Sequence, residues 1–518
     1  MKPFLFLLIL FPGVALSQLP PNVDRFVESV MREFQVPGAA VAVVKDGKVL
    51  LAKGYGVRAL GQAARVDAMT NFGIASNTKL FTATALALLV EEGKIAWDAP
   101  VIRYMPAFAM YDPFVTRELT VRDLLVHRSG LGLGAGDLLW WPESTYDRAE
   151  IVRRLRFVRP ATSFRNAYAY DNVLYTVAGE LIEAVSGQTW EDFVAERILI
   201  PVGMTGSTVL HSAAGTAGNV AATHAEVEGV VKAVPPMTSD NTNPAGGINS
   251  SARDMAKWLI VQLDSGRLPD GTQLFRTSTT RALWTLVTPI PTGSPPPELQ
   301  PHRSWVRGYA LGLDVRDYRG RQMLSHTGGL PGYLSKVTMI PDMKLGVAVL
   351  LNQESGAAFN AISFHIVDHF LGADRLDYLA AYRAIDRRNR DAIAAEERRS
   401  AAVRDTTSRP SLPPASYAGT YTDQWYGDVL ITRDPAGKLG IRFVRTPSLV
   451  GDLVHWQHDT FLARWHDRTL RADAFVTFTL TPDGKIEQAR MLPASPSVDF
   501  SFNFQDLVLT PSRQSSPP

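Results

Sequence analysis

The sequence predicts an α+β domain followed by a small all-β domain, and two observations support this prediction. Strand-like runs at residues 39–53 and 309–352 enclose a long region of helical patterning, which is typical of a sheet with a helical subdomain set against it. Beyond residue 416 the pattern changes to short alternating runs separated by Pro-Ala-Gly and Pro-Asp-Gly turns, which predicts a β-barrel. The 518 residues, of which 46% are hydrophobic, are enough for two or three cores.

The predicted domain boundaries follow these changes of pattern. We expect a signal peptide at 1–17, an α+β domain at 18–374, a charged helical linker at 375–415, a β-barrel domain at 416–511 and a disordered tail at 512–518. The first segment joins one lysine to a short apolar run and a small-residue cleavage site, so the protein is expected to be exported, periplasmic or secreted. The alternative, a membrane anchor, needs roughly 20 apolar residues, far more than this run has, so no membrane span is expected after cleavage.

Helical spacing, with glycine or proline where each pattern stops, places the elements of the first domain. Helices are predicted at residues 23–35, 79–92, 119–125, 173–186, 189–200, 254–263 and 359–371. A hairpin is predicted at 39–53, further strands at 309–316, 322–326, 335–340 and 345–352, and an exposed proline-rich loop at 288–304. In the barrel domain, strands are predicted at 429–432, 439–444, 461–465, 475–480 and 500–504.

Composition excludes several classes of function. The formal net charge of +2 comes without a basic stripe, so no nucleic-acid partner is expected. The absence of cysteine excludes disulfides, thiolate catalysis and zinc–cysteine sites. The ten histidines have no metal-binding spacing, so we expect no metal and no other cofactor.

Ser76 is a candidate nucleophile because it lies where a helix should begin. Lys79 follows one helical turn later, on the same face, and its amine would lie beside the Ser76 hydroxyl. A lysine held among apolar neighbours loses its proton more readily, so it can accept the serine proton. A Ser-x-x-Lys spacing is also typical of a helix cap followed by a surface lysine, so its weight depends on the other motifs.

Two further motifs supply the groups that serine chemistry needs. Tyr170 is a candidate proton acceptor, because a nearby Lys79 would lower the pKa of its phenol, and Asn172 could hydrogen-bond both Lys79 and a substrate carbonyl. His326, Thr327 and Gly328 are expected on a strand whose glycines let a substrate backbone approach closely.

Each of these residues also has a purely structural interpretation. Tyr170 could be a half-buried aromatic, Asn172 a helix cap and His326 an ordinary strand residue. Two tryptophans at 140–141 could line a substrate mouth, although a local hydrophobic plug is the safer interpretation. The backbone N–H groups of Ser76 and Gly329 are candidates for an oxyanion hole.

Taken together, Ser76-x-x-Lys79, Tyr170-x-Asn172 and His326-Thr327-Gly328 resemble, in order and approximate spacing, the three motifs of the serine β-lactamase-related hydrolases. This group includes class C β-lactamases, D-Ala-D-Ala carboxypeptidases, D-aminopeptidases and esterases. The resemblance covers residues 23–371, with supporting similarity at 124–131, 201–204 and 246–254. Residues 417–510 look like the lipocalin-like β domain appended to some members.

The resemblance implies a fold and a set of roles. It implies an antiparallel sheet flanked by helices plus an all-helical subdomain, with the site in the crevice between them. Ser76 would be the acylated nucleophile, Lys79 and Tyr170 would share proton transfer, and Asn172 would position the substrate. His326 and Thr327 would lie along the opposite wall.

One departure from the family pattern bears on the substrate. Class C β-lactamases normally carry lysine where this chain has His326, and that charge helps to hold the β-lactam carboxylate. A histidine, with a reference pKa of about 6.5, is mostly neutral at neutral pH. This favours a peptidase, amidase or esterase over an efficient β-lactamase.

The favoured hypothesis is therefore an exported serine hydrolase that forms an acyl-enzyme at Ser76. Its substrate would be a small molecule or peptide, which could derive from peptidoglycan, with a D-amino-acid amide, ester or β-lactam bond. The alternatives are a class C-like β-lactamase and a protein that binds penicillin, a peptidoglycan fragment or a lipid-like ligand without turnover, in the same pocket or in the barrel. An α/β-hydrolase is excluded, because no serine has the Gly-x-Ser-x-Gly flanking. The bond cleaved, stereochemical preference, role of the barrel and oligomeric state are left open.

Overall fold

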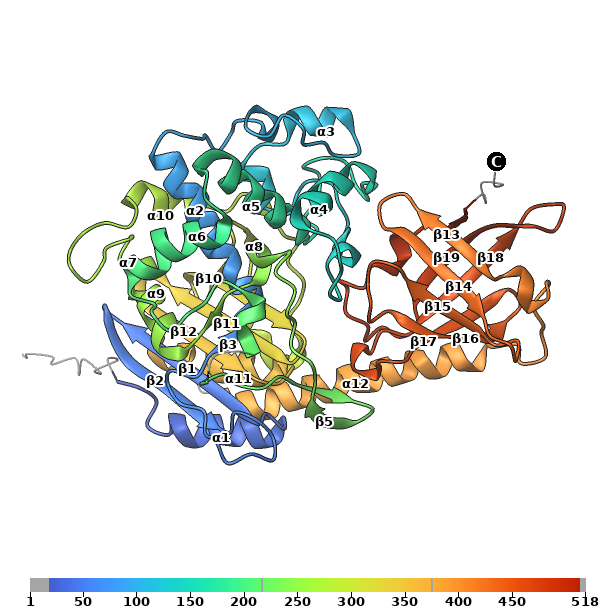
Figure 1. Cartoon of the computed structure of the whole chain (residues 1–518). Coiled ribbons are helices and arrows are strands. Elements are labelled where there is room, and N and C mark those ends of the chain that lie inside the picture. The colour runs from blue at the N-terminus through green and yellow to red at the C-terminus, as the bar shows by residue number, and fades with distance from the viewer. Residues whose placement is uncertain (1–17, 216–217, 374–375, 513–518) are drawn as a thin grey trace, which may run out of the picture.

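The computed structural model describes residues 18–215, 218–373 and 376–512. The predicted signal peptide lies outside the described residues, as does the predicted tail apart from Ser512. The chain folds into an α+β domain and a C-terminal barrel, which are joined by the helix α12 (Tyr378–Ala402) (Figure 1). The predicted fold class is confirmed.

An eight-stranded antiparallel sheet forms the centre of the first domain. Neighbouring strands run in the order β2-β1-β12-β11-β10-β9-β8-β7. In chain order their bounds are β1 Gly38–Lys45, β2 Lys48–Gly56, β7 Thr288–Pro289, β8 Arg307–Tyr309, β9 Asp314–Tyr318, β10 Arg321–Leu330, β11 Tyr333–Ile340 and β12 Leu345–Leu351.

Alternate side chains of the sheet enter two different cores. In β1, Val41 and Val43 pack with the helices α1 (Val23–Glu33) and α11 (Gly356–Phe370). Ala40 and Ala42 face the opposite way, into the larger core that holds most of the other helices. Strand β1 is buried on both faces because helices lie on each side of the sheet, and its sequence is accordingly an almost continuous apolar run.

The helical subdomain lies against the second face of the sheet, and α3, α4 and α5 gather above it in Figure 1. Its helices are α2 Lys79–Glu91, α3 Pro113–Glu118, α4 Arg148–Arg154, α5 Val173–Ser186, α6 Trp190–Val194, α7 Ile200–Val202, α8 Asn243–Gly246 and α10 Thr277–Trp284, while α9 Ala252–Leu263 packs on β1 and β12. Short pairs join β3 Phe72–Gly73 to β6 Asn249–Ser250 and β4 His224–Val227 to β5 Val230–Ala233.

Several elements of this domain differ from the sequence prediction. The loop predicted at 288–304 contains β7 and a partly buried 3₁₀ turn over Pro297–His302. The helix predicted at 189–200 is divided into α6, a π-helical turn over Ala195–Leu199 and α7, which continues past Pro201.

The strand predicted at 309–316 is interrupted between β8 and β9, where Gly312 adopts a φ of +80°. A Cβ atom at Gly312 would lie 2.9 Å from the carbonyl oxygen of Lys79, so the chain bends here to meet the first turn of α2. The helix predicted at 119–125 is only a short 3₁₀ turn over Arg122–Leu125.

The C-terminal domain is a nearly closed eight-stranded antiparallel barrel, which confirms the predicted architecture. Its strands, in the order β19-β18-β17-β16-β15-β14-β13-β20, are β13 Gly419–Asp423, β14 Gly427–Arg433, β15 Leu439–Phe443, β16 Val450–Gln457, β17 Thr460–Trp465, β18 Ala474–Leu480, β19 Ile486–Pro493 and β20 Thr510–Pro511. A bridge between Ala489 and Leu509 brings the two ends of the sheet together.

The interior of this barrel is filled by aromatic side chains. Phe461 and Phe478 pack edge-on against Tyr417 with ring centroids 5.0 and 4.9 Å away, and Phe443 packs against Trp465 at 5.8 Å. All five side chains are buried. These contacts argue against the alternative that the barrel encloses a small ligand.

The prediction of a strand at 500–504 is wrong. The alternation of Phe500, Phe502 and Phe504 with polar residues suits a half-buried strand, but residues 499–503 leave the barrel and contact the first domain. We call residues 499–503 the crossing segment. This segment lies between the two domains: Ser501 and Asn503 bond to the first domain, while Phe504 just beyond it packs on Phe443 and Trp465 inside the barrel.

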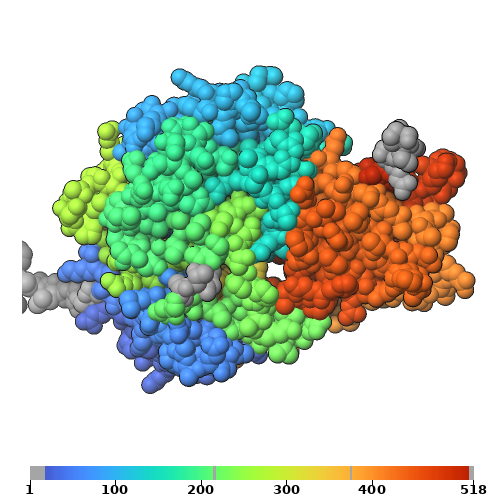
Figure 2. Space-filling view, in the orientation of Figure 1, coloured from blue at the N-terminus to red at the C-terminus, as the bar shows by residue number. Residues whose placement is uncertain are grey.

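Further contacts fix the barrel against the first domain. Arg471 forms a bidentate ion pair with Glu354, with N···O distances of 2.7 and 2.8 Å, and the guanidinium of Arg154 donates to the carbonyl of Trp425 at 2.9 Å. The space-filling view shows the two domains in contact, with a hollow between them (Figure 2). Within the described ranges, no helix combines the length and apolar character needed to cross a membrane.

The turn that carries Ser76 packs directly against β10. A Cβ atom at Gly328 would lie 2.2 Å from the carbonyl oxygen of Ile74, so only glycine lets this strand approach the turn so closely. The absence of a side chain at Gly328 therefore lets the backbone of the Ser76 turn approach β10, whereas the sequence analysis expected a substrate backbone to approach there. At Gly329 the nearest atom to such a Cβ is Leu334 Cδ2, 3.2 Å away.

We expect Gly328→Ala to destabilise the first domain by about 1–3 kcal/mol, because the added methyl group must displace the backbone beside Ser76. Differential scanning calorimetry of the full chain should show a lower Tm for the transition of this domain. Gly329→Ala is the matched control and should leave the Tm nearly unchanged. Equal Tm values for both variants would contradict the tight approach at Gly328.

Candidate active site

Ser76 lies at the entrance to α2, where the chain changes from a strand to a helix. The preceding residue, Ala75, has a left-handed backbone with φ +50°, which is strained for a residue other than glycine. The hydroxyl of Ser335 holds the turn by donating to the carbonyl of Ile74 at 2.7 Å, and Asn77 donates to Ser335 at 2.7 Å. The turn thus fixes Ser76 between the sheet and the helical subdomain.

The amine of Lys79 has three polar neighbours, and they define its hydrogen bonding. Its Nζ lies 3.0 Å from Ser76 Oγ, 2.8 Å from Asn172 Oδ1 and 3.0 Å from the carbonyl oxygen of Ala245. The amide and carbonyl oxygens can only accept, so a neutral amine donates its two hydrogens to them. Its lone pair then faces the Ser76 hydroxyl, which is the arrangement that a proton acceptor requires.

Because the Lys79 amine is buried, its neutral form is populated near neutral pH. Lys79 is fully buried, and desolvation lowers its pKa from 10.5 to about 7, although the charges of Asp137 and Asp171 act in the opposite direction. The structure thus places Lys79 beside Ser76, as predicted, but its amine is buried among polar groups instead of apolar neighbours.

The expectation for Tyr170 is wrong with respect to its pKa. Burial raises the pKa of the phenol well above 10, and this outweighs the hydrogen bond between Tyr170 and Ser76, which acts in the opposite direction. The Lys79 amine lies over the Tyr170 ring, 5.0 Å from its centroid. Tyr170 is consequently a neutral phenol beside Ser76, which can donate a proton but is a poor acceptor.

His326 is neutral, and its contacts fix the tautomer. Its Nδ1 lies 2.6 Å from the carbonyl oxygen of Thr327, which can only accept, so Nδ1 carries the hydrogen. Its Nε2 then accepts from the Tyr309 hydroxyl at 2.7 Å. Burial, followed by the nearby charge of Lys79, lowers the pKa of His326 to about 3, so this wall carries no positive charge at neutral pH.

The structure brings most of the predicted site residues to one cavity of about 250 Å³. Its lining includes Ser76, Tyr170, Asn172, His326, Thr327 and Gly329. Lys79 lies directly behind Ser76, and Gly328 faces the Ser76 turn. The assignment of the Ser76 and Gly329 N–H groups as an oxyanion hole stays a prediction.

Asp137 is a polar residue of the site that the sequence analysis missed. It lies in a 3₁₀ turn over Asp137–Leu139 and is completely buried. Its Oδ2 accepts from Asn172 Nδ2 at 2.8 Å, and its Oδ1 accepts from Trp140 Nε1 at 3.0 Å. Burial raises the pKa of Asp137 above 3.8, while these donors lower it. Nothing in its local sequence distinguishes this aspartate from an ordinary loop residue.

The crossing segment also lines the cavity around Ser76. Phe500 packs edge-on against Tyr170, with ring centroids 6.1 Å apart. A Cβ atom at Gly134, where φ is +66°, would lie 2.6 Å from the Phe500 carbonyl oxygen, so this glycine admits the segment. The barrel domain therefore supplies part of the wall of the candidate active site, which the sequence did not indicate.

The two tryptophans satisfy both of their predicted interpretations. Trp140 and Trp141 are 5% and 8% exposed, so they fill local space as a plug would. Both also line the cavity around Ser76, and Trp141 packs edge-on against Phe502 of the crossing segment, with centroids 6.3 Å apart.

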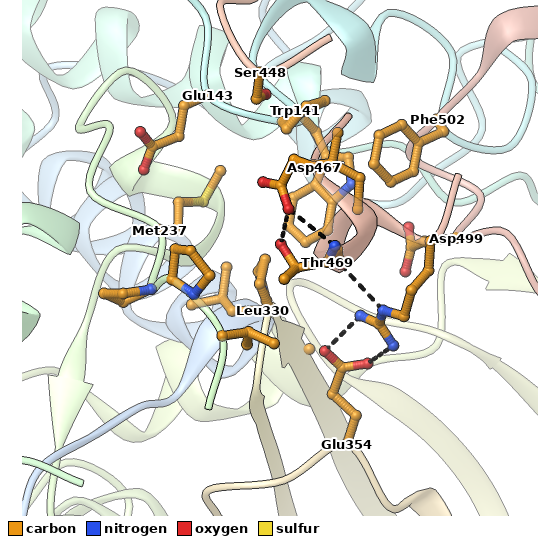
Figure 3. Close-up of a pocket in the computed structure, with 18 of the residues that line it drawn as sticks. Trp141, Glu143, Met237, Leu330, Glu354, Ser448, Asp467, Thr469, Asp499 and Phe502 are labelled. Carbon is orange, nitrogen blue, oxygen red and sulfur yellow. Dashed lines mark hydrogen bonds and ion pairs between the residues drawn. The ribbon is translucent and has the colours of Figure 1, made fainter. Parts of the chain in front are cut away.

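A second, larger cavity of about 1140 Å³ lies between the two domains (Figure 3). It shares Trp141, Gly329, Leu330 and Asp499 with the cavity around Ser76, so the two cavities are adjacent at these residues. Figure 3 shows Glu143 and Met237 of the first domain facing Ser448 and Asp467 of the barrel across it. The site thus lies beside a space large enough for a peptide-sized molecule.

Comparisons with known proteins agree with this geometry. The family profile described as beta-lactamase matches residues 23–368, and a profile described as a domain of unknown function, DUF3471, matches residues 403–511. The chain is 29% identical to "Unguisins hydrolase ungD" of Aspergillus violaceofuscus over 82% of this chain and 78% of that protein. It is 28% identical to "Penicillin-binding protein 4" of Amycolatopsis lactamdurans over 65% of this chain and 86% of that protein.

Among solved structures, the octameric penicillin-binding protein homologue from Pyrococcus abyssi is similar over 94% of this chain and 99% of that chain, with a TM-score of 0.59 and 20% identity. This likeness concerns the fold. Since the beta-lactamase profile matches most of the chain, and the Ser76, Lys79, Tyr170 and Asn172 side chains gather at one cavity, the chain belongs to the beta-lactamase family.

Proposed function

We propose that the protein is an exported serine hydrolase that forms an acyl-enzyme at Ser76 and hydrolyses an amide or ester bond in a D-amino-acid peptide or related compound. The observation that carries the proposal is the hydrogen bonding of Lys79. In its neutral form, the buried amine donates its two hydrogens to two acceptors, and its lone pair faces the Ser76 hydroxyl. A surface lysine near a helix cap would have none of these constraints.

In the proposed acylation step, Lys79 accepts the proton of Ser76 as Oγ attacks the substrate carbonyl carbon. A C–O bond to Ser76 forms, the bond from that carbon to the leaving nitrogen or oxygen breaks, and the proton passes to the leaving group. Tyr170 is suited to relay that proton, because it is a neutral phenol hydrogen-bonded to Ser76. Water then releases the acyl group by the same route in reverse.

The lining of the cavity favours an amidase, peptidase or esterase over a β-lactamase or carboxypeptidase. Those latter substrates carry a carboxylate near the scissile bond, and a nearby cation strengthens its binding. Among the described residues, the lining of the cavity around Ser76 includes no lysine or arginine, and His326 is neutral. Any reaction with penicillin is therefore expected to be slow.

The larger cavity supports a substrate that extends beyond the scissile bond. It adjoins the Ser76 cavity and shares four lining residues with it, which supports a bound pose in which the remote part of a peptide lies between the domains. The match to a relative named as an unguisins hydrolase spans 82% of this chain, and this supports hydrolysis as the activity of both domains together.

The proposal is tested by intact-mass spectrometry of the full chain after brief exposure to an activated short-chain ester and, separately, to a penicillin. We expect a transient ester adduct on Ser76 with steady turnover, and little or slow modification by penicillin. Ser76→Ala should lose at least about 10³-fold in ester hydrolysis, since the nucleophile is removed. Full activity of that variant would refute the proposal. A permanent adduct without product release would favour the binding alternative.

The rate of acylation should depend on pH through Lys79. Because its pKa is lowered to about 7, the neutral, proton-accepting amine predominates only above that pH. We expect kcat/KM for the ester to fall as pH decreases below about 7 and to level off above it. Stopped-flow or steady-state rates between pH 5 and 9 measure this profile. A rate independent of pH across that range would contradict Lys79 as the proton acceptor.

A further inference from the structure

The hydrogen bonds of Asp137 connect the catalytic lysine to the C-terminal domain. Asp137 Oδ2 accepts from Asn172 Nδ2 and also from Ser501 Oγ of the crossing segment, both at 2.8 Å. Asn172 in turn presents its Oδ1 to Lys79. A continuous series of three short hydrogen bonds thus leads from the barrel domain to the group beside the nucleophile.

A side chain of the crossing segment also holds the backbone of the turn that carries Asp137. Asn503 Oδ1 accepts from the N–H of Leu138 at 3.0 Å, and Asn503 Nδ2 donates to Asp506 at 3.0 Å. Ser501 and Asn503 are both buried, with exposed fractions of 4% and 0%. Two adjacent points of the Asp137 turn are therefore fixed by residues more than 360 positions away in the sequence.

We propose that Ser501 is a positioning residue of the active site, which holds the carboxylate of Asp137 against Asn172 and thereby sets the orientation of Asn172 and Lys79. The barrel domain is then part of the catalytic apparatus, beyond forming a wall of the cavity. This inference rests on the proposed function, because it concerns the same lysine. Ser501 itself acts only through Asp137.

The argument depends on what a buried carboxylate needs. Asp137 has no access to water, so no solvent molecule can replace a donor that its carboxylate loses. Without the Ser501 hydroxyl, only Asn172 holds Oδ2, and the carboxylate can rotate or take up a proton. Either change weakens the constraint on the Asn172 amide, whose other end receives a hydrogen bond from Lys79.

Loss of Ser501 should also change the titration of Lys79. The Ser501 hydrogen bond lowers the pKa of Asp137, and the Asp137 charge raises the pKa of Lys79. Removing the hydroxyl makes Asp137 less often charged, so the pKa of Lys79 should fall. The other titratable groups that interact with these two are Asp171, a second carboxylate, and four neutral side chains, His127, His326, Tyr170 and Tyr175.

The test compares Ser501→Ala with the wild type in the full chain, using p-nitrophenyl acetate from pH 5 to 9. We expect kcat/KM on the plateau to fall about tenfold or more, because the proton acceptor is less well placed. The acid limb of the profile should move to lower pH by about half a unit or more. Ser501→Thr, which keeps the hydroxyl, should retain the wild-type acid limb.

The matched control is Ser495→Ala, a serine earlier in the same loop whose hydroxyl donates to Glu397. It should match the wild type in rate and profile. Ser76→Ala is measured in parallel: if it stays active, the proposed function fails, whereas an inactive Ser76→Ala alongside a normal Ser501→Ala would overturn only the present inference.

The Tm of each variant is measured, which shows whether Ser501→Ala still folds. Asp137→Asn is a second variant that changes the other partner of the same hydrogen bond. If Asp137 carries the effect, adding Ser501→Ala to Asp137→Asn should cause no further shift of the acid limb. An acid limb unchanged from the wild type in Ser501→Ala, whether or not the rate falls, would overturn the proposal. So would a further shift in the double variant, because Ser501 would then act by another route.

Discussion

The structure depends on one constraint, which is that the amine of Lys79 is buried without a carboxylate in direct contact. A fully solvated lysine would hold its proton at neutral pH, and a lysine in a close ion pair would hold it more tightly. Here the direct partners are an amide oxygen, a carbonyl oxygen and the Ser76 hydroxyl. The charges of Asp137 and Asp171 oppose the loss of the proton, but desolvation is the larger effect.

Keeping that amine in place requires precise support from several parts of the chain. The strained turn at Ala75 sets Ser76, and α8 supplies the carbonyl of Ala245. Asn172 at the start of α5 connects Lys79 to Asp137. The crossing segment completes this arrangement from the other domain. The interior of the barrel is filled with aromatic side chains, so the barrel contributes to the site through its loops. The large cavity between the domains lies where those loops meet the first domain.

The sequence was sufficient to predict the fold class, the bounds of α5 and the residues nearest to the nucleophile, because each depends on local pattern. The helix at 173–186 ends at Gly187 with φ +76°, as a glycine stop predicts. What the sequence could not reveal depends on burial and on distant contacts. The raised pKa of Tyr170 follows from its surroundings, and the role of Asp137 depends on Ser501. The run at 500–504 alternates like a strand, but no sheet receives it, because its side chains from 500 to 503 contact the first domain and Phe504 enters the barrel.

The most direct test of this account is a titration of Lys79 itself, by NMR of protein labelled at the lysine Cε carbons, with the signal assigned through Lys79→Arg. The account predicts that the Lys79 signal titrates with a pKa of about 7. Burial lowers the pKa of Lys336 to about 7 as well, so the loss of one of these two signals in Lys79→Arg identifies the signal of Lys79. A Lys79 pKa of about 10.4, the ordinary value for a solvated lysine, would contradict it, because the amine would then be protonated at neutral pH and could not accept the proton of Ser76.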